Sequence, residues 1–228
     1  MHGSFTLVFE TSTPQASLAT VDDRGQLDQR EFTSDRSHNA VLFSPLQKLL
    51  AAQAAAGPEL VLVGSGPGSY SGTRVGIAAA QGVAIACGCP AVALPSILAV
   101  PSARCGGACL AIGDARRGTY WIARIEDHQL LTEPALTDAQ GLLAAVSHAV
   151  AGKSAVVSFD DPFRFPLPSE LQSEVRLEFP DARGLWLAWN DSPPATRDRW
   201  LREIPQPLYL KPPHITPAKR PWLVRQPV

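Results

Sequence analysis

The chain has 228 residues, of which 45% are hydrophobic, so it can bury the core of one large domain or of two smaller lobes. Its 20 basic and 21 acidic residues give a formal net charge of −1, which argues against a broad cationic surface for nucleic acid or membranes. The N-terminus lacks the basic start and apolar core of a signal peptide, and we therefore expect a cytoplasmic protein.

The cysteines do not predict a metal site. They occur at C-x-C and C-x-x-x-C spacing, whereas zinc knuckles usually have C-x-x-C. We expect all of them to be small buried thiols in a reducing compartment. They are Cys87, Cys89, Cys105 and Cys109.

Three antiparallel strands are predicted at the start of the chain, over Phe5–Glu10, Ala16–Val21 and Leu27–Phe32. A helix should follow them, because apolar residues recur at helical spacing from Val41 to Leu50. Ser37 is a suitable N-cap for this helix.

The stretch Leu60–Ala86 predicts a buried strand, a glycine loop and a long helix. Glycines in the loop allow unusual backbone angles and bring amide groups close to a ligand or to another backbone. No lysine completes a nucleotide-binding P-loop. The loop is therefore compatible with phosphate binding and also with a plain sharp turn from strand to helix.

Small residues recur at every fourth position of this helix, and they are Gly72, Gly76, Ala80, Ala84 and Gly88. Such a stripe allows another helix to approach closely, so we predict a contact surface for a partner or for a second copy of the chain. The alternative is that the stripe packs against the protein's own sheet. The uncharged run from Val75 to Ala103 does not predict a membrane span, because glycine and prolines interrupt it.

The same order of elements is predicted again after Gly107, with strands Ala108–Gly113 and Thr119–Ile125, helix Asp138–Val150 and strand Ala155–Phe159. This duplication is typical of the actin, hexokinase and Hsp70 type of α/β fold (ASKHA), in which two lobes, each a mixed sheet with flanking helices, face each other across a cleft. We place the N-terminal lobe at residues 1–105 and a smaller C-terminal lobe at 106–228.

The chain beyond Phe159 is rich in proline, and we expect it to be mostly irregular. Only two regular elements are predicted there, a helix at Asp181–Asn190 and a last strand at Leu208–Lys211.

Several motifs resemble those of the TsaB (YeaZ) family, the partner subunit of the bacterial machinery that makes threonylcarbamoyladenosine at position 37 of tRNAs reading codons that begin with A. The glycine motif is specific when it occurs together with the later Asp-Ala-Arg-Arg motif. The matching segments are Glu10–Thr13, Ser37–His38, Gly66–Gly76, Ala80–Gly82, Asp114–Tyr120 and Tyr209–Lys211.

The resemblance implies a non-catalytic scaffold that binds and activates the catalytic TsaD subunit. It further implies a TsaE-type ATPase in the full complex, contact with tRNA through the complex, a homodimer when the chain is alone, and no membrane. In the TsaD family two histidines four residues apart hold a metal. The corresponding residues here are Ser96 and Val100, which cannot replace imidazole ligands.

The resemblance also implies three groups of site residues. The partner or dimer interface is expected at Gly72, Arg74, Gly76, Ala79, Ala80, Val83 and Ala84. Candidate contacts to a phosphate or nucleotide are Glu10, Thr11, Ser12, Gly66, Gly68 and Ser69. Candidate contacts within the complex are His38, Asp114, Arg116 and Arg117.

Two departures from the family pattern weaken the case for a nucleotide. Family members have Asp where this chain has Glu10, and a glycine-rich turn where it has the acidic turn Ser158–Asp161. Carboxylates in that turn would repel a phosphate. We therefore expect no cofactor, with at most weak nucleotide binding.

Two other functions stay open. An ATP-dependent ATPase or kinase of the same fold would need carboxylates for magnesium in both lobes and a second phosphate loop. A glycoprotease-like peptidase homologue would need a metal site or a nucleophile with a base in reach. Glu10 and the acidic turn argue against the first function, and the scattered Ser, His and acidic residues argue against the second.

Overall fold

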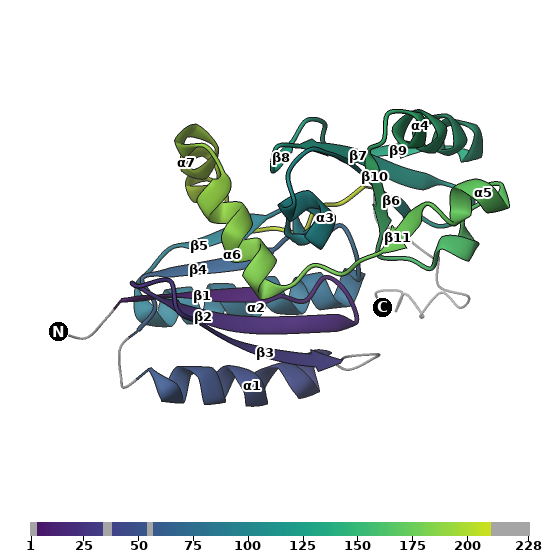
Figure 1. Ribbon diagram of the computed structural model, residues 1–228. Coiled ribbons are helices and arrows are strands. Elements are labelled where there is room, and N and C mark those ends of the chain that lie inside the picture. The colour runs from purple at the N-terminus through teal and green to yellow at the C-terminus, as the bar shows by residue number, and fades with distance from the viewer. Residues whose placement is uncertain (1–3, 34–37, 54–56, 211–228) are drawn as a thin grey trace, which may run out of the picture.

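A computed structural model describes residues 4–33, 38–53 and 57–210 of the chain. Figure 1 shows two lobes, each built around its own sheet. The N-terminal lobe comprises β1 (Phe5–Glu10), β2 (Gln15–Asp22), β3 (Leu27–Thr33), α1 (His38–Ala52), β4 (Leu60–Gly64), α2 (Tyr70–Cys87), β5 (Ala91–Leu94), the 3-10 helix η1 (Ser96–Ala99) and α3 (Pro101–Arg104).

The first sheet has the strand order β3-β2-β1-β4-β5. Its first three strands are antiparallel neighbours, as predicted, and β4 and β5 continue the sheet in parallel to β1. Phe9 pairs with Leu18 on one side and with Val63 on the other, so β1 lies at the centre of the lobe.

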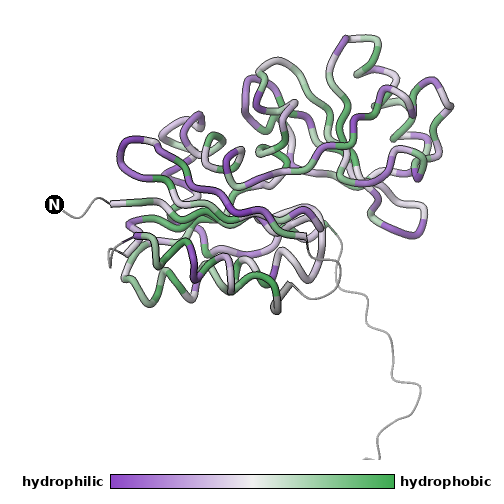
Figure 2. Tube along the Cα trace, turned by 60° about the horizontal axis from the view of Figure 1, so that its bottom comes forward, coloured by the Kyte–Doolittle hydropathy of each residue, from purple (hydrophilic) through white to green (hydrophobic). Residues whose placement is uncertain are grey.

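The two faces of β1 belong to two different cores. Phe5, Leu7 and Phe9 point toward α1 and α2 and are buried with apolar residues of these helices. Val8 points to the opposite face, where it joins Leu185 of helix α6 (Ala182–Asp191) in a core that both lobes share. Figure 2 shows hydrophobic stretches along the strands and helices of this lobe. Because β1 has no solvent-exposed face, its apolar run lacks the alternation of a half-buried strand.

The remaining elements are β6 (Ala108–Asp114), β7 (Tyr120–Glu126), β8 (Gln129–Leu130), β9 (Ala135–Thr137), α4 (Ala139–Ala151), β10 (Ala155–Ser158), η2 (Pro162–Arg164), α5 (Ser169–Gln172), β11 (Val175–Leu177), α6 (Ala182–Asp191) and α7 (Pro194–Arg202). The second sheet has the order β11-β10-β6-β7-β8, and β9 also pairs with β7. Leu142 and Val146 of α4 cover one face of this sheet over Leu110 and Ile112.

The two sheets repeat one plan. In each, the first strand pairs with the second in antiparallel fashion and with the strand after the helix in parallel fashion. The predicted duplication is therefore confirmed, and the chain has two mixed sheets with flanking helices.

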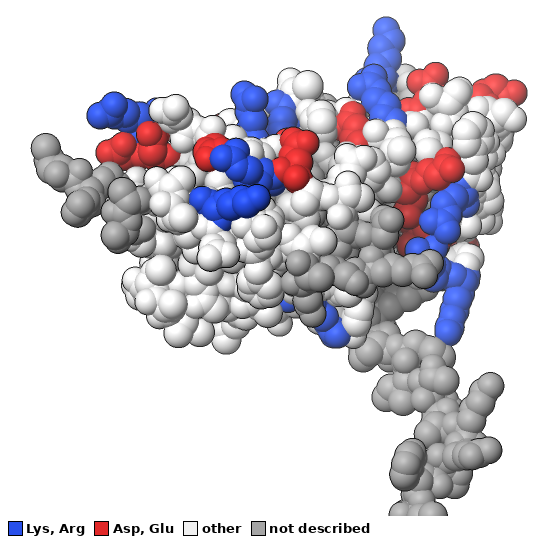
Figure 3. Space-filling view, turned by 90° about the horizontal axis from the view of Figure 1, so that it is seen from below, with Lys and Arg blue, Asp and Glu red and all other residues white. Residues whose placement is uncertain are grey.

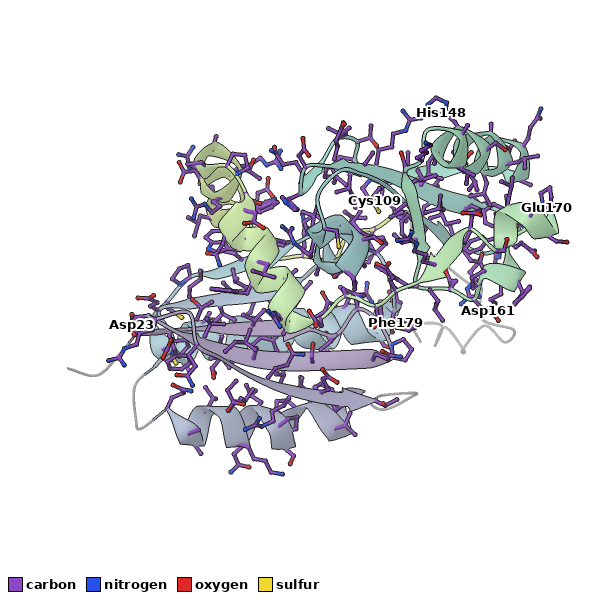
Figure 4. The ribbon with its side chains drawn as sticks, viewed as in Figure 1. Asp23, Cys109, His148, Asp161, Glu170 and Phe179 are labelled. Carbon is purple, nitrogen blue, oxygen red and sulfur yellow. The ribbon has the colours of Figure 1, made fainter. Side chains whose placement is uncertain are left out.

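Residues beyond Phe179 return to the N-terminal lobe (Figure 4). Helix α6 packs on the first sheet, where the amide of Ala182 donates a hydrogen bond to the Ser17 hydroxyl at 2.8 Å. The spatial lobes therefore do not follow a linear division at residue 105.

The prediction of a mostly irregular end was wrong in two respects. Helices α5 and α7, the 3-10 helix η2 and strand β11 were not predicted. Leu208–Leu210 is not a strand, although Leu208 donates a backbone hydrogen bond to Ser65 at 2.9 Å. The remaining residue of that predicted strand, Lys211, lies outside the described residues, as does the predicted N-cap Ser37.

The cysteine prediction was also wrong in part. All four thiols are free, but Cys87 and Cys105 are exposed and Cys89 is half-buried. Only Cys109 is buried, and burial raises the pKa of its thiol to about 12. At neutral pH this thiol is therefore uncharged and suited to a packing role.

Candidate functional site

The glycine loop between β4 and α2 packs directly on the turn between β1 and β2. The Ser69 amide donates a hydrogen bond to the Ser12 carbonyl at 2.6 Å. A Cβ atom at Gly68 would overlap the same carbonyl oxygen. Gly68 is thus required because two backbones approach each other, which favours the sharp-turn interpretation of the loop.

Glu10 is fully buried beneath this loop. Its Oε1 atom accepts a hydrogen bond from the Ser12 amide at 2.8 Å, and the missing side chain of Gly64 leaves the space for Oε2. Burial raises the pKa of the Glu10 carboxyl, and the hydrogen bonds of Ser12 and Ser96 oppose this shift only in part. Glu10 is therefore part of the packed junction under the loop and does not line the cleft.

Most of the residues predicted to contact phosphate lie below the surface. Four of the six are buried, namely Glu10, Thr11, Ser12 and Gly66. The Thr11 hydroxyl donates to the Gly72 carbonyl at 2.9 Å, so it ties β1 to α2. The structure therefore brings the six predicted residues together in a packed junction between the glycine loop and the β1–β2 turn. Only two of them, Gly68 and Ser69, reach the surface of the cleft between the lobes.

The cleft itself is a cavity of about 360 Å³. The glycine loop forms one wall, and Asp114 and Trp121 of the C-terminal lobe form another. The segment Pro205–Leu210, which we call the C-terminal strap, lies across it. The strap is held by the bond from Leu208 to Ser65 and by a hydrogen bond from the Gln81 side chain to the Pro205 carbonyl at 3.1 Å.

Asp114 and Arg116 form a tight local turn after β6. One oxygen of Asp114 accepts a hydrogen bond from the Arg116 amide at 2.7 Å, and the other lies 3.1 Å from the Arg116 guanidinium. Arg116 and Arg117 both have positive φ, 69° and 60°, so their backbone conformation is set by the turn. This is the ordinary use of Asp in a turn.

The acidic turn after β10 supports neighbouring backbone. Asp160 accepts a hydrogen bond from the Asp114 amide at 2.9 Å. Asp161, labelled in Figure 4, accepts from the Phe163 amide at 3.0 Å and caps η2. The carboxylates that distinguish this turn therefore have structural partners.

The stripe of small residues on α2 faces inward, and the expectation that it forms an open groove was wrong. A Cβ at Gly76 would overlap the Thr11 hydroxyl. The buried positions include four of the seven predicted interface residues, namely Gly72, Gly76, Ala80 and Ala84. They let α2 lie close to its own sheet, which was the alternative interpretation.

The opposite side of α2 forms an apolar groove with α1, which we call the α1–α2 face. It has a volume of about 750 Å³ and contains Arg74, Ala79 and Val83 of the predicted interface. The other residues that line it were not among the predicted interface residues; they are Phe43, Leu46, Val75, Ala78, Gly82 and Ala86. Phe43 is 57% exposed. Figure 3 shows that charged side chains of the N-terminal lobe gather along the upper part of this view, whereas the lower part carries few.

The helical phase of the sequence shows that α2 has a second apolar face, although it does not show which face is open. Val75, Ala78, Ala79, Gly82 and Val83 recur at intervals of three and four, as the buried stripe does, but they are rotated around the axis. Both sides of α2 are therefore apolar, but only the inner side is packed against the sheet.

Other predicted positions are placed as follows. Ser96 and Val100 are fully buried, and the Ser96 hydroxyl accepts a hydrogen bond from the Gly66 amide at 3.1 Å. His38 is the first residue of α1, and its side chain lies outside the described part.

Within residues 4–33, 38–53 and 57–210, no cluster of three His, Cys, Asp or Glu side chains is arranged to hold a metal. Over the same ranges no helix is both long and apolar enough to cross a bilayer.

Two duplicated lobes, each a mixed sheet with flanking helices and joined across a cleft, define the actin-like ASKHA class of fold. Within this class, residues 32–168 match the family described as TsaD, tRNA N6-adenosine threonylcarbamoyltransferase. The match spans more than half of the chain, and the protein belongs to this family.

Individual relatives share sequence or fold with this chain. An uncharacterized protein of Mycobacterium tuberculosis is 31% identical over 153 residues, which cover 65% of this chain and 72% of that protein. YeaZ from Pseudomonas aeruginosa superposes with a TM-score of 0.65 at 20% identity, over 91% of this chain and 100% of that one. A second Pseudomonas aeruginosa structure, an uncharacterized protein with similarity to peptidase YEAZ, gives a TM-score of 0.68 at 20% identity over the same shares.

The structural likeness at this identity establishes the fold. Together with the family match, it confirms the resemblance to the TsaB (YeaZ) family.

Proposed function

We propose that this chain is a non-catalytic scaffold subunit that binds and activates a TsaD-type catalytic subunit for threonylcarbamoyl transfer to adenosine 37 of tRNA. The observation that carries the proposal is the α1–α2 face, an uncovered apolar surface on a helix whose other side is already packed. A continuous apolar face of this kind marks a protein interface. Because a family relative has the corresponding loop and helix, the two chains could pair through equivalent faces.

A scaffold role is supported by the chemistry at the cleft. The metal-ligand positions of the catalytic relatives are occupied here by Ser96 and Val100, which serve the core. Glu10, the carboxyl nearest to the glycine loop, is buried and hydrogen bonded to Ser12. An ATPase or kinase would need an accessible carboxylate at this place, so the alternative enzyme functions have weaker support.

The remaining partners follow from this role. A TsaE-type ATPase would join the full complex, and tRNA would be bound by the assembled complex. In the absence of TsaD, the α1–α2 face would pair with the same face of a second copy, because a self-complementary patch gives a twofold dimer. The two assemblies would then compete for one surface.

The test is co-expression with a TsaD subunit from the same source, followed by affinity capture and size-exclusion chromatography. Phe43→Glu and Ala78→Glu place a charge in the α1–α2 face, where it would have to be desolvated on pairing. We expect both variants to fold and to lose TsaD. Phe163→Glu is the matched control, because Phe163 is 80% exposed and lies in the C-terminal lobe.

Retention of TsaD by both face variants would contradict the assignment of the interface. Threonylcarbamoyl transfer by the isolated chain would contradict its non-catalytic role.

A further inference from the structure

Of the described residues that line the α1–α2 face, only Arg74 has a charged side chain. Arg74 also lines the cleft, so it lies where the face and the cleft meet. The Arg74 guanidinium carbon lies 3.8 Å from the centre of the Tyr70 ring and 5.2 Å from that of Tyr209. The Arg74 Nε atom also donates a hydrogen bond to the Tyr209 hydroxyl at 2.7 Å. Two aromatic side chains therefore hold a cation at the edge of the proposed interface.

This guanidinium is held in place but has no acidic partner in the described part of the chain. None of the ion pairs among residues 4–33, 38–53 and 57–210 includes Arg74. Over the same ranges only its Nε atom has a hydrogen-bond partner, so the terminal nitrogens are available to an acceptor. The planar end of an arginine matches the two oxygens of a carboxylate. Because Tyr70 and Tyr209 already restrict this side chain, binding of a carboxylate would cost little further side-chain entropy.

The two helices that form the face carry positive charge only. Helix α1 contains Lys48 and helix α2 contains Arg74, and neither helix contains an Asp or Glu residue. The chain as a whole has 20 basic and 21 acidic residues, so this face is cationic although the chain is not. Such a surface is complementary to a partner that presents carboxylates.

This charge distinguishes the two assemblies that would compete for the face. In a homodimer through equivalent faces, each Arg74 would meet a surface that is lined by no carboxylate, and burial of an unpaired guanidinium costs free energy. A partner with a carboxylate opposite Arg74 would offset this cost through a charge-assisted hydrogen bond. The homodimer should therefore be the weaker assembly.

We propose that Arg74 binds a carboxylate of the TsaD-type subunit, and that this contact makes the heterodimer prevail over the homodimer. Tyr70 and Tyr209 are positioning residues that hold the guanidinium. This inference rests on the proposed function, because it assigns partner specificity to the face through which TsaD is proposed to bind. It also gives the C-terminal strap a role in pairing, since Tyr209 belongs to the strap.

The experiment compares two dissociation constants, both measured with the purified full-length chain and without RNA. Binding to purified TsaD is measured by biolayer interferometry, and self-association by analytical ultracentrifugation. Arg74→Gln removes the charge, and we expect it to weaken TsaD binding about thirtyfold, as truncation of an interface hot spot does. Self-association of this variant should be as tight as in wild type or tighter. Arg124→Gln is the matched control, because Arg124 is an exposed arginine on β7 of the other lobe.

Further variants test the geometry of the contact. Arg74→Lys keeps the charge without the planar end, so it should recover part of the affinity for TsaD that Arg74→Gln loses. Tyr209→Phe keeps the ring but removes the acceptor of the Nε hydrogen bond, and it should weaken TsaD binding about threefold to tenfold. Added to Arg74→Gln, Tyr209→Phe should have no additional effect, because Tyr209 acts through Arg74. Melting curves of every variant check that the fold is intact.

Loss of TsaD by Phe43→Glu together with wild-type binding by Arg74→Gln would overturn this inference and leave the proposed pairing intact. Equal weakening of TsaD binding and self-association by Arg74→Gln would also overturn it, because Arg74 would then not select between the two assemblies. An additional loss in the double variant would refute the positioning role of Tyr209. Retention of TsaD by Phe43→Glu would instead contradict pairing through the α1–α2 face, and this inference would fall with it.

Discussion

The two sides of α2 have nearly the same composition and different roles. The inner side carries Gly72, Gly76, Ala80 and Ala84, which are buried against the lobe's own sheet. The outer side carries Ala78, Ala79, Gly82 and Val83, which line an open groove with α1. Small residues on the inner side therefore secure the fold, whereas those on the outer side leave room for another molecule. The comparison shows that side-chain size alone does not locate an interface on a helix.

The largest effect that we expect is loss of stability on filling the inner side. Gly76→Leu should destabilise the protein by about 3 kcal/mol, because even a Cβ atom would overlap the Thr11 hydroxyl beneath it. The measurement is urea denaturation followed by circular dichroism.

The matched control for this variant lies on the outer side of the same helix. Gly82 has no atom within 4 Å of the position of an added Cβ. Gly82→Leu should therefore not destabilise the protein, and the higher helix propensity of Leu should raise the free energy of unfolding by up to about 1 kcal/mol. Similar destabilisation by both substitutions would remove the distinction between the two sides.

The order of the elements could be predicted from sequence for most of the chain, because apolar periodicity and turn residues mark the first strands and helices clearly. The side of α2 could not be predicted in the same way. Its inner and outer residues are both small or apolar, so hydropathy does not tell them apart. The distinction depends on how closely Thr11, the residue that follows β1, approaches Gly76, and this is a tertiary contact.

The C-terminal region was mispredicted because of its prolines. Pro194 is the first residue of α7, a position at which its missing N–H costs nothing and its fixed φ favours the helix. Pro194 thus begins a helix, whereas the many prolines of this region had led to the prediction of irregular structure. The strap shows the reverse error, because Leu208 makes a single backbone hydrogen bond to Ser65 and no ladder.

The residues of the candidate site were predicted from the sequence, but their burial was not. Glu10, Thr11 and Ser12 do lie beside the glycine loop, but they are buried. A motif that binds phosphate and one that packs two backbones together need the same glycines, so sequence alone could not separate them.

An intermediate effect is expected at Glu10, in the junction beneath the inner side of α2. Because burial raises its pKa above the unfolded value, the wild-type protein gains stability from this group below the unfolded pKa of about 4.3. It loses that contribution as pH rises through the folded pKa. Glu10→Gln keeps an acceptor for the Ser12 amide and cannot ionise. We therefore expect Glu10→Gln to be more stable than wild type at pH 8 and to approach it at pH 4.

Chemical denaturation at a series of pH values measures this difference. Parallel stability profiles of the two proteins would show that Glu10 ionises in the fold as easily as it does in the unfolded chain.

The smallest effect on stability is expected at the turn after β6, which faces the cleft from the other lobe and belongs to neither side of α2. Arg116 pairs with Asp114 at 3.1 Å while its side chain is 64% exposed, and exposed pairs of this kind contribute at most about 1 kcal/mol. Replacing Arg116 and Arg117 with Ala should therefore change the melting temperature little.

If this turn is a contact within the assembled complex, the same variant should lower tRNA modification in a reconstituted system with TsaD and TsaE. Asp114→Ala separates the two roles, because it removes the acceptor of the Arg116 amide and should loosen the turn itself. Full modification by the double arginine variant would mean that the turn is only a solvated connection between two strands, and that contacts in the complex are confined to the N-terminal lobe and the strap.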